Sequence, residues 1–397
     1  MWNKELRTSG LTLTLLLIFA LPLSAQEGLW PMFRRLVERV GMVREPAHEK
    51  GILSWSYRTA AIDGRPPIQS SAAIGDDGRI YIGAGGSDGE VTNLYVLDSA
   101  GSLAWSYRTG PYGFIDSSPL IASSGKIYFG SKDYLLYALG SNGSLIWSYM
   151  IGDDVWTCNA LGDGGEIYLG SADKGLYAVD SNASLKWSYK TGGEIASSPA
   201  RGVDGRICAG SHDNNMYVLD SIGSLLWSYR TKRIVYGSPI VGSDEKLYFG
   251  SSGDHNIYAL NSGGALNWSY TTGWFVDSYL TLGSDGRIFV GSFDNRLYAL
   301  NSNGSLYWSY KTAVSPPFGD PPIMMPRQGS PIEGAGGTIY SGAFDNRVYA
   351  LGANGSLLWS YMTARFIQTS PAIGKDGRLY IGGTDSVIYC LRPIPPR

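Results

Sequence analysis

Between residues 117 and 149, four short apolar-rich runs are separated by turn signals. The runs cover residues 117–122, 126–130, 135–139 and 144–149. Apolar runs of this length, bounded by Gly, Asn, Asp and Ser, predict β-strands. The pairs Ser-Gly and Asn-Gly between them predict two-residue hairpin turns, in which both central residues adopt positive φ. The pattern therefore predicts a four-stranded antiparallel meander.

The same pattern recurs along most of the chain and is marked by the triplet Trp-Ser-Tyr. Most copies lie about 40 residues apart, which is the period of a four-stranded propeller blade. We therefore expect an all-β fold, an eight-bladed β-propeller of four-stranded antiparallel blades. We expect the eight tryptophans to stack adjacent blades, each indole burying about 150–250 Å². They are Trp55, Trp105, Trp147, Trp187, Trp227, Trp268, Trp308 and Trp359.

The two ends of the repeat predict how the ring closes. Residues 52–57 carry a Trp-Ser-Tyr copy with no strands before it, whereas the last unit, residues 369–391, has three strands and no such copy. The N-terminal strand would complete the last blade and leave no unpaired edge at the seam. We expect the propeller to span residues 52–392, followed by a tail at residues 393–397.

The residues before the repeats resemble a targeting segment. A short basic region is followed by an apolar run at residues 11–21, which is too short to span a membrane, and then by Ala25. These features predict a signal peptide at residues 1–25, followed by an N-terminal extension at residues 26–51. No Cys follows the apolar run, so a lipid anchor is not expected. With no later transmembrane segment, we expect the mature chain to be exported, either periplasmic or secreted.

The composition excludes several classes of protein and site. The net charge is −2, so no basic field favours nucleic acid. Aromatic residues make up 13% of the chain, which is too many for a disordered one. The cysteines, Cys158, Cys208 and Cys390, stand alone in separate repeats, so we expect buried thiols and neither disulfides nor a metal site. We expect a monomer.

Four motifs of the repeat together resemble a known family. Ser-Ser-Pro, Ile-Tyr-x-Gly-Ser, Leu-Tyr-Ala-Leu and Gly-Ser-Leu-x-Trp-Ser-Tyr are similar to the repeat of the pyrroloquinoline-quinone (PQQ) β-propellers, over about residues 52–391. The family includes quinoprotein dehydrogenases, the propeller lipoprotein of the outer-membrane barrel assembly machine and other exported proteins. The resemblance implies the fold but no single activity.

The features that the resemblance implies for an enzyme are missing. A quinoprotein dehydrogenase would be expected to carry an adjacent cysteine pair, a calcium site and a catalytic Asp in a larger chain. No two cysteines are adjacent here, and His48, His212 and His255 have no metal-ligand spacing. We therefore expect no cofactor, PQQ with calcium included, and name no catalytic residue, although spacing alone does not decide against a Ser/His/Asp arrangement.

One position of the repeat differs between blades while its neighbours recur. It precedes the Ser-Ser-Pro motif, and we expect it to line the mouth of the central channel. The residues are Gln69, Asp116, Trp156, Ala196, Tyr236, Asp277, Gln328 and Gln368. Aromatic rings with amides and carboxylates suit a small molecule such as a quinone or a sugar. The alternative is a ring of solvated loop residues around a water-filled channel.

Three insertions break the period, at residues 60–67 and 85–90 in the first blade and 314–325 in the seventh. All are expected on the face that carries the channel mouth, and insertions gathered on one face often mark a binding face. The third contains Phe318, Ile323, Met324 and Met325, which would form an adaptable contact patch for a protein partner. Proline-stiffened loops that only cover the channel are the alternative.

Two further repeat positions have a structural interpretation. A glycine ends each second strand, where we expect close backbone or ring approach. An aspartate follows it, at Asp133, Asp173, Asp213, Asp254, Asp294, Asp345 and Asp385. One carboxylate per repeat is a weak calcium signal, and we expect each Asp to cap its own turn.

The sequence therefore predicts an exported, non-enzymatic β-propeller that acts as a protein-binding or scaffold module through the face carrying the insertions. The competing hypothesis is a small-molecule binding protein, for a quinone or a sugar, or a quinoprotein-type oxidoreductase, with its site at the channel mouth.

Overall fold

The structure is a computed structural model that describes residues 51–59, 68–85, 93–110, 113–157, 159–312 and 329–393. The expected signal peptide, nearly all of the N-terminal extension and most of the three insertions lie outside these residues. Within the part of the chain that is described, no helix is long and apolar enough to cross a membrane.

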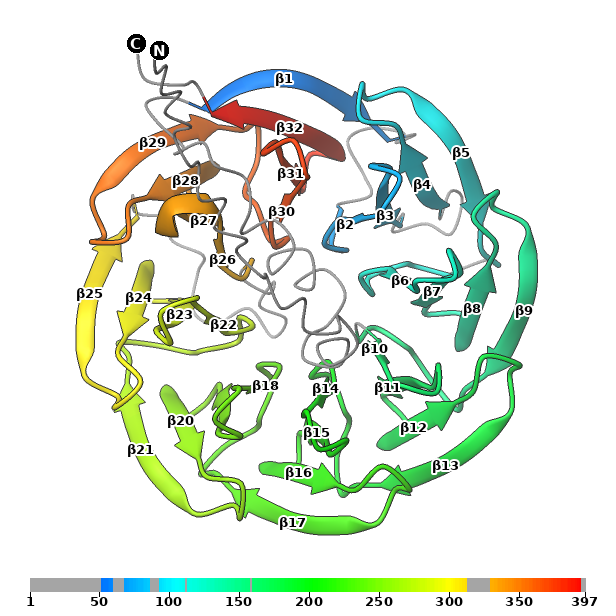
Figure 1. The fold of residues 1–397 in the computed structure, drawn as a ribbon, viewed down its shortest axis with the longest axis vertical. Helices are drawn as coiled ribbons and strands as arrows, with labels where there is room; N and C mark the ends of the chain where they lie inside the picture. The colour runs from blue at the N-terminus through cyan, green and yellow to red at the C-terminus, as the bar shows by residue number, and fades with distance from the viewer. Residues whose placement is uncertain are drawn as a thin grey trace, which may run out of the picture.

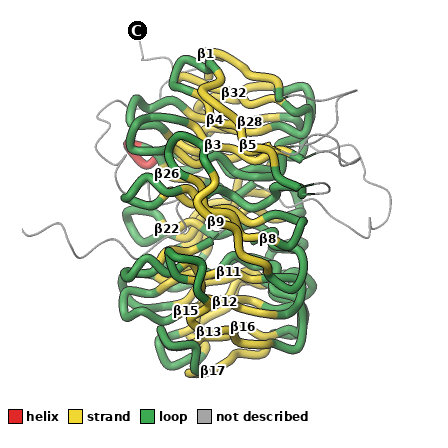
Figure 2. The backbone as a smooth tube through the Cα atoms, turned by 90° about the vertical axis from the view of Figure 1, so that its right-hand side faces the viewer, coloured by secondary structure: helices red, strands yellow, loops and turns green. Residues whose placement is uncertain are grey.

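Eight four-stranded antiparallel sheets stand around a central axis and form a closed ring (Figure 1). This confirms the predicted eight-bladed propeller. Seen from the side, the ring is a thick disc with loops along both faces (Figure 2). We call one face the linker face, because it carries the linkers between blades and the turns between second and third strands. The opposite turn face carries the other two turns of each blade.

The first four blades follow chain order. Their strands are β2 (Ala73–Ile74), β3 (Ile80–Ala84), β4 (Asn93–Leu97) and β5 (Leu103–Arg108) in blade 1; β6 (Leu120–Ile121), β7 (Ile127–Gly130), β8 (Leu135–Leu139) and β9 (Leu145–Met150) in blade 2; β10 (Ala160–Leu161), β11 (Ile167–Gly170), β12 (Gly175–Val179) and β13 (Leu185–Lys190) in blade 3; and β14 (Ala200–Arg201), β15 (Ile207–Gly210), β16 (Asn215–Leu219) and β17 (Leu225–Arg230) in blade 4.

The next three blades continue the pattern. Their strands are β18 (Ile240–Val241), β19 (Leu247–Gly250), β20 (Asn256–Leu260) and β21 (Leu266–Thr271) in blade 5; β22 (Thr281–Leu282), β23 (Ile288–Ser292), β24 (Arg296–Leu300) and β25 (Leu306–Lys311) in blade 6; and β26 (Ile332–Glu333), β27 (Ile339–Gly342), β28 (Arg347–Leu351) and β29 (Leu357–Met362) in blade 7, with a 3-10 turn, η2 (Ala335–Gly337), after β26.

Blade 8 joins the two ends of the chain. It contains β30 (Ala372–Ile373), β31 (Leu379–Gly382), β32 (Val387–Pro393) and, as its outer strand, β1 (Gly51–Arg58). β1 runs antiparallel to β32, with Gly51 opposite Pro393 and Tyr57 opposite Ile388. The predicted closure of the ring by the N-terminal strand is therefore confirmed.

The first strands are shorter than the sequence predicts. Residues 117–122 are expected in a strand, but only Leu120 and Ile121 pair with β7. The hydroxyl of Ser117 instead bonds to both the N–H and the C=O of Gly130, at 2.8 and 2.7 Å. Pro119 has no N–H to offer a neighbouring strand. The Ser-Ser-Pro motif thus ends pairing rather than extending it.

The hairpin turns also differ from the prediction. Gly143 has φ of 83°, but Asn142 does not have positive φ. The N–H of Gly143 donates to the C=O of Gly140, and the N–H of Gly140 donates to the C=O of Ser144. These bonds define a three-residue loop with one left-handed residue, not a two-residue turn with two. The Asn142 side chain accepts the N–H of Ser144 at 3.1 Å and caps the loop.

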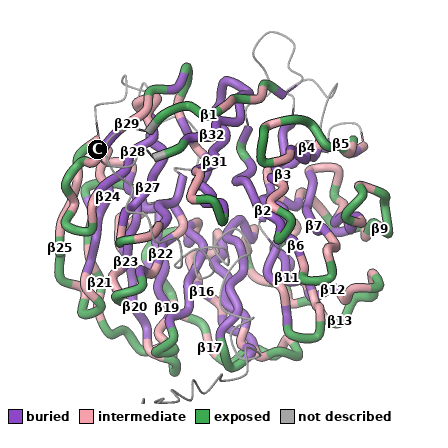
Figure 3. Tube along the Cα trace, turned by 45° about the horizontal axis from the view of Figure 1, so that its top comes forward, coloured by how far each residue is buried: buried purple, intermediate pink, exposed green. Residues whose placement is uncertain are grey.

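The core lies between blades rather than within them. Between blades 1 and 2, for example, Tyr81 and Leu94 of one blade pack against Phe129 and Tyr137 of the next, with Trp105 at the edge. Eight such clusters, one at each blade contact, surround the ring. Burial is concentrated in the three inner strands, and the outer strands are partly exposed (Figure 3). Each blade is therefore stable only against its neighbours.

The tryptophans of the repeat link each blade to the next on the turn face. Trp147 Nε1 donates to the C=O of Ser181 in blade 3 at 2.9 Å, and Lys126 Nζ approaches the same oxygen at 3.4 Å. Similar bonds join Trp55 to Ser99, Trp187 to Ser221, Trp227 to Ser262, Trp268 to Ser302 and Trp308 to Ala353. Each neutral bond contributes about 0.5–1.5 kcal/mol net. The indoles of Trp105 and Trp359 have no such bond among the described residues.

Candidate functional site

Seven of the linkers between blades are positioned by one buried β-branched residue each. Val155 has no exposed surface and lies against Gly130 of the preceding blade, where a Cβ on the glycine would be 2.2 Å from Val155 Cγ1. Ile115, Ile195, Val235, Val276, Ile367 and Ile68 are seated in the same way on the glycines of their preceding blades. The expected close approach at these glycines is confirmed. Because side chains alternate along an extended linker, the next residue points away from this contact.

Four of the described linkers are also hydrogen-bonded to the turns on both sides of them. The N–H of Val155 donates to the C=O of Ser131 in blade 2, and the N–H of Ala172 in blade 3 donates to the C=O of Asp154. Equivalent pairs recur in other blades, for example Ile195 to Ser171 and His212 to Glu194. Among the described residues, hydrogen bonds therefore join the linkers to the turns between second and third strands from blade 2 to blade 5 and again between blades 7 and 8.

The residues predicted to line the channel mouth follow the seated linker residues. Gln69 is exposed; Asp116, Trp156, Tyr236, Asp277 and Gln368 are half-buried; and Ala196 is buried. Gln328 lies outside the described residues. The structure brings these positions together on one face, but most of their side chains contact a protein neighbour.

Their neighbours form a second set, which the sequence analysis missed. It occupies the repeat position two residues after the glycine of the second strand, in the turn between second and third strands: Lys132, Ala172, His212, Ser252, Phe293, Phe344 and Thr384. His212 stacks on Tyr236, with ring centroids 5.4 Å apart, and the Ser252 hydroxyl donates to Asp277. These residues also differ between blades while their surroundings recur, which is the signal that would have found them.

Charged groups gather on the part of this face formed by blades 2, 3 and 4. Lys132 Nζ lies 2.7 Å from Asp116 Oδ2 and 5.6 Å from the ring centre of Trp156. Burial raises the pKa of Asp154 above its ordinary value; Lys132 opposes this shift, and Asp116 adds to it, as do nearby Asp153 and Glu194. Lys132 is therefore held among more carboxylates than it can neutralise.

Aromatic rings gather on the part formed by blades 5 to 8. Trp274 is 46% exposed and stacks on His255 at 6.1 Å, with Phe275 at their edges. Phe293 lies 5.3 Å from Phe344, and Phe344 lies 6.1 Å from Phe366. We call these six residues the aromatic arc. The linker face thus has a cluster of charged groups over blades 2 to 4, with Trp156 and the His212–Tyr236 stack beside it, and a run of aromatic rings over blades 5 to 8.

Tyr279 of blade 6 reaches past blade 5 and contacts blade 4. It occupies the position that carries the second Ser of Ser-Ser-Pro in most blades, and its hydroxyl lies 3.2 Å from Ser198 Oγ, two blades away. Elsewhere this Ser joins neighbouring blades, as where the N–H of Ser71 donates to Ser118 Oγ at 3.0 Å. The intervening blade 5 has Gly237 before this position, where a Cβ would be 3.3 Å from the C=O of Ser278. The phenol therefore links blades 4 and 6 past blade 5.

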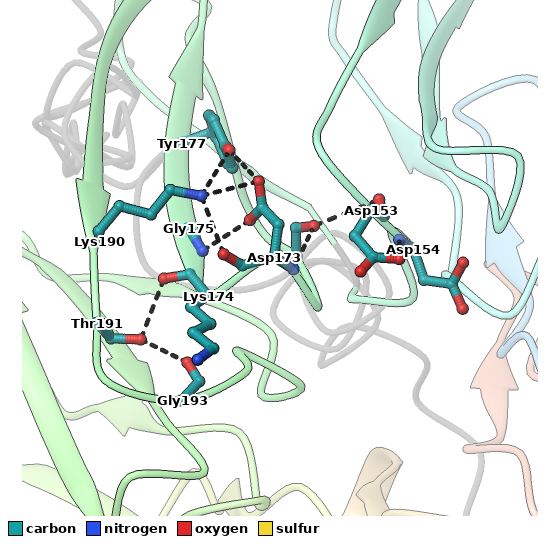
Figure 4. Close-up of polar contacts among 10 residues, drawn as sticks. Asp153, Asp154, Asp173, Lys174, Gly175, Tyr177, Lys190, Thr191 and Gly193 are labelled. Carbon is teal, nitrogen blue, oxygen red and sulfur yellow. Dashed lines mark hydrogen bonds and ion pairs between the residues drawn. The ribbon is translucent and has the colours of Figure 1, made fainter.

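The repeated aspartates are occupied by their own turns, as predicted. Asp173 accepts the N–H of Gly175 at 2.8 Å, the hydroxyl of Tyr177, and Lys190 Nζ at 2.9 Å (Figure 4). Burial alone would raise the pKa of Asp173, but the bonds from Tyr177 and Lys190 outweigh it and lower that pKa.

In other blades the second oxygen holds the linker instead. Asp213, for example, accepts the N–H of Gly192 at 2.7 Å. The described residues contain no group of three or more His, Cys, Asp or Glu side chains arranged to hold a metal ion.

The remaining predicted residues give no reactive site. Cys208 and Cys390 are buried and unpaired, and burial raises the pKa of each thiol to about 12. Cys158 lies outside the described residues, as do the expected contact residues Phe318, Ile323, Met324 and Met325. In the chain, the segment holding the last four follows β25 and precedes β26.

Comparisons with known proteins agree with the propeller fold. The sequence matches a family model described as "Outer membrane protein assembly factor BamB" over residues 92–240 and 222–391. No curated protein matches it.

Two solved structures are similar in fold. The crystal structure of BamB from Moraxella catarrhalis is 20% identical, with a TM-score of 0.64 over 85% of this chain and 98% of that one. The computationally designed Ika8 protein is 15% identical, with a TM-score of 0.66 over 85% and 99%. A designed protein matches as well as a natural one, so these likenesses indicate a shared fold and not a shared function.

Proposed function

The chain belongs to the family described as outer membrane protein assembly factor BamB, and from this we propose that it is an exported, non-enzymatic assembly factor. In this proposal it is periplasmic or associated with the outer membrane after removal of residues 1–25. It binds a protein partner through the linker face and works as a scaffold, as a monomer at low concentration.

The observation that carries the proposal is the asymmetry of the linker face. On the turn face, the same hydrogen bond from an indole N–H to a backbone C=O of the next blade recurs in most blades. The linker face instead has charged groups over blades 2 to 4 and aromatic rings over blades 5 to 8. In the chain order, the three insertions fall between β1 and β2, β3 and β4, and β25 and β26, the connections that the proposal assigns to the linker face. A mixed apolar and charged surface of this kind suits a protein partner.

Trp274 provides the sharpest test, because it is the most exposed residue of the aromatic arc and belongs to no inter-blade cluster. Trp274→Ser should weaken co-purification of the native partner at least tenfold. Aromatic residues with exposed rings are the commonest energetic centres of interfaces. The matched control is Ile222→Ser, because Ile222 is 74% exposed on the turn face. Equal losses in the two variants, or no loss in either, would refute the use of the linker face.

A second candidate function, small-molecule binding at the channel mouth, is supported by two unpaired groups in blade 3. The indole N–H of Trp156 and both polar atoms of the Asn159 side chain are buried without a hydrogen-bond partner among the described residues. Asn159 occupies the position that is Pro in five other blades. A polar, uncharged ligand such as a sugar, or a quinone with its carbonyl oxygens, would satisfy them.

Thermal shift separates this candidate from the first. The wild type is mixed with PQQ and calcium, or with single monosaccharides, and the melting temperature is measured. Asn159→Pro restores the repeat residue and should stabilise the fold, since it removes an unpaired buried amide. A ligand that raises the melting temperature of the wild type but not of Asn159→Pro supports the site. No shift with any of these ligands removes the candidate.

A further inference from the structure

Each blade presents its fourth strand as an open edge on the circumference of the ring. β9 is the last strand in the order β6-β7-β8-β9, and within the described residues no strand pairs with its outer side. It lies on the wall of the disc between β5 and β13 (Figures 1 and 2). An edge strand carries unpaired N–H and C=O groups, whose natural complement is another extended backbone.

The register defines which backbone groups of β9 are free. Ile151 N–H donates to the C=O of Tyr134, and Tyr149 lies opposite Leu136. Bonds to β8 alternate along an antiparallel strand, so residues 151, 149 and 147 face β8. The N–H and C=O groups of Ser148 and Met150 therefore point outward.

Most of the outer strands have a basic residue near this edge, whereas β9 has none. The last residue is Arg58, Arg108, Lys190, Arg230 or Lys311 in five blades, Thr271 in one, and Met150 or Met362 in the other two. Charged residues on edge strands are a common protection against unwanted pairing. In β9 the exposed side chains are Ser148 and three apolar ones, Leu145 (48%), Ile146 (46%) and Met150 (64%).

We propose that β9 is a self-association site, where it pairs antiparallel with β9 of a second copy of this chain. Outward-facing residues must pair with each other, and the register with the two-fold axis at Ser148 meets this condition. Trp147 then lies opposite Tyr149 of the second copy, and Met150 extends towards Ile146, the extra residue of the β-bulge between Leu145 and Trp147. Apolar residues meet apolar residues and aromatic residues meet aromatic ones, which are favourable cross-strand pairs.

The outer strands of other blades are less suited than β9 to pairing with a second copy. The same pairing of β13 would bring Lys186 close to Lys190 of the second copy, and like charges near each other across a ladder destabilise it. β29 also lacks charge, but its Leu358 is only partly exposed, Trp359 is buried, and β1 runs beside it. β9 is therefore the edge that combines exposure, apolar character and freedom from charge.

The association should be weak. One strand edge buries far less than the about 1,200–2,000 Å² of a stable interface, so we expect dissociation constants of about 10 µM to 1 mM. The protein would be monomeric at low concentration, as the sequence predicts, and would pair where its local concentration is high. The site is on the circumference, so it is independent of the proposed use of the linker face.

A cysteine at the two-fold axis tests the register. In a hydrogen-bonded antiparallel pair the Cα atoms are about 5.5 Å apart, within the range that a disulfide spans. Ser148→Cys should therefore form a covalent dimer under mild oxidation at about 0.1 mM protein. Ser188→Cys, the same repeat position on β13, is the matched control. Cross-linking of Ser148→Cys at least tenfold faster than Ser188→Cys supports the proposal, and equal rates overturn it.

Sedimentation of variants without added cysteine tests the edge itself. Met150→Arg introduces the residue that blades 1, 4 and 8 carry at this position, so the fold should tolerate it. The weight-average mass of the wild type should rise with concentration, and that of Met150→Arg should stay monomeric. Met362→Arg on β29 is the control and should behave as the wild type. A wild type that stays monomeric up to about 1 mM, or one whose association is abolished by Met362→Arg instead, refutes the assignment.

Discussion

Gly223→Ala should destabilise the propeller through the indole of the neighbouring blade. Gly223 lies in the turn between β16 and β17 with φ of 87°, and a Cβ there would be 2.6 Å from Trp187 Cδ2. The left-handed conformation costs an Ala about 1–2 kcal/mol, and reduced freedom of the unfolded chain returns about 0.4–1 kcal/mol. Overpacking against the ring adds about 1–3 kcal/mol. We expect Gly223→Ala to lower the free energy of unfolding by about 2–4 kcal/mol in total.

Two controls separate the backbone from the ring. Gly286 has φ of 80° in an equivalent loop, but no atom lies within 4 Å of its added Cβ. Gly286→Ala should therefore cost only the backbone part, about 1 kcal/mol. In a Trp187→Ala background the ring is absent, and Gly223→Ala should fall to the same value. The coupling energy between the two sites should be about 1–3 kcal/mol.

The assay is equilibrium unfolding in urea, followed by circular dichroism on all four variants. Blade 3 sets the lower limit of the effect, because it carries Ala183 with φ of 67° at this position while Trp147 still bonds to Ser181 at 2.9 Å. An indole can thus adjust to a methyl group, and Ala183→Gly should gain up to about 1 kcal/mol. If Gly223→Ala costs no more than Gly286→Ala, or if its cost is unchanged without the indole, the ring does not pack on the turn as described.

Three further predictions concern pH, thiol reactivity and ring closure. Burial, with hydrogen bonding for Tyr217, raises the pKa of Tyr168 and Tyr217 to about 12. The folded state therefore holds these protons more tightly than the unfolded state, so their contribution to stability should be full below about pH 10 and fall as pH rises towards 12. A urea midpoint that stays constant between about pH 10 and 12 would contradict the burial of the phenols. Burial raises the pKa of Cys208 to about 12, whereas after unfolding it is about 8.5. At pH 8 the thiol should therefore react with an alkylating reagent roughly a thousandfold more slowly in the native than in the unfolded protein. Rapid labelling of the native protein would contradict the burial of this thiol. Deletion of residues 51–58 should cost about 5 kcal/mol or more, since it removes Trp55 and Tyr57 from the seam, and an unchanged melting temperature would show that the ring closes without β1.

The architecture could be predicted from sequence because every blade repeats it. A single copy of Trp-Ser-Tyr at residues 55–57 and a last unit without one were enough to predict closure, since edge strands at a seam must be paired. The extent of the first strands was wrong because the hydroxyl of Ser117 competes with the ladder for the backbone of Gly130. The predicted type of hairpin loop was wrong because a side chain such as that of Asn142 caps the loop, so that one glycine with positive φ is enough to form it.

The candidate site was predicted less completely. Position in the repeat was enough to gather Asp116, Trp156 and Tyr236 on one face. Their contacts were not visible, because the partners Lys132 and His212 belong to another segment of the repeat.

The contact of Tyr279 with Ser198 could not be inferred at all. It joins blades 4 and 6 across an intervening one, so it depends on the radius and curvature of the whole ring rather than on any local spacing. The replacement of Ser by Tyr was visible in the sequence, but the destination of its hydroxyl was not.

The pairing of β1 with β32 imposes an order on synthesis. Gly51 and its partner Pro393 are separated by nearly the whole chain. At translation rates of about 5–20 residues per second, β1 waits about 20–70 s for its partner to be made. During this time seven blades can stack, but the first and last blades of this open arc each have one face without a neighbour. Ile52, Leu53 and Trp55 stay exposed during that interval. Protection of these side chains therefore decides whether the chain closes its own ring or aggregates with another chain whose ring is still open.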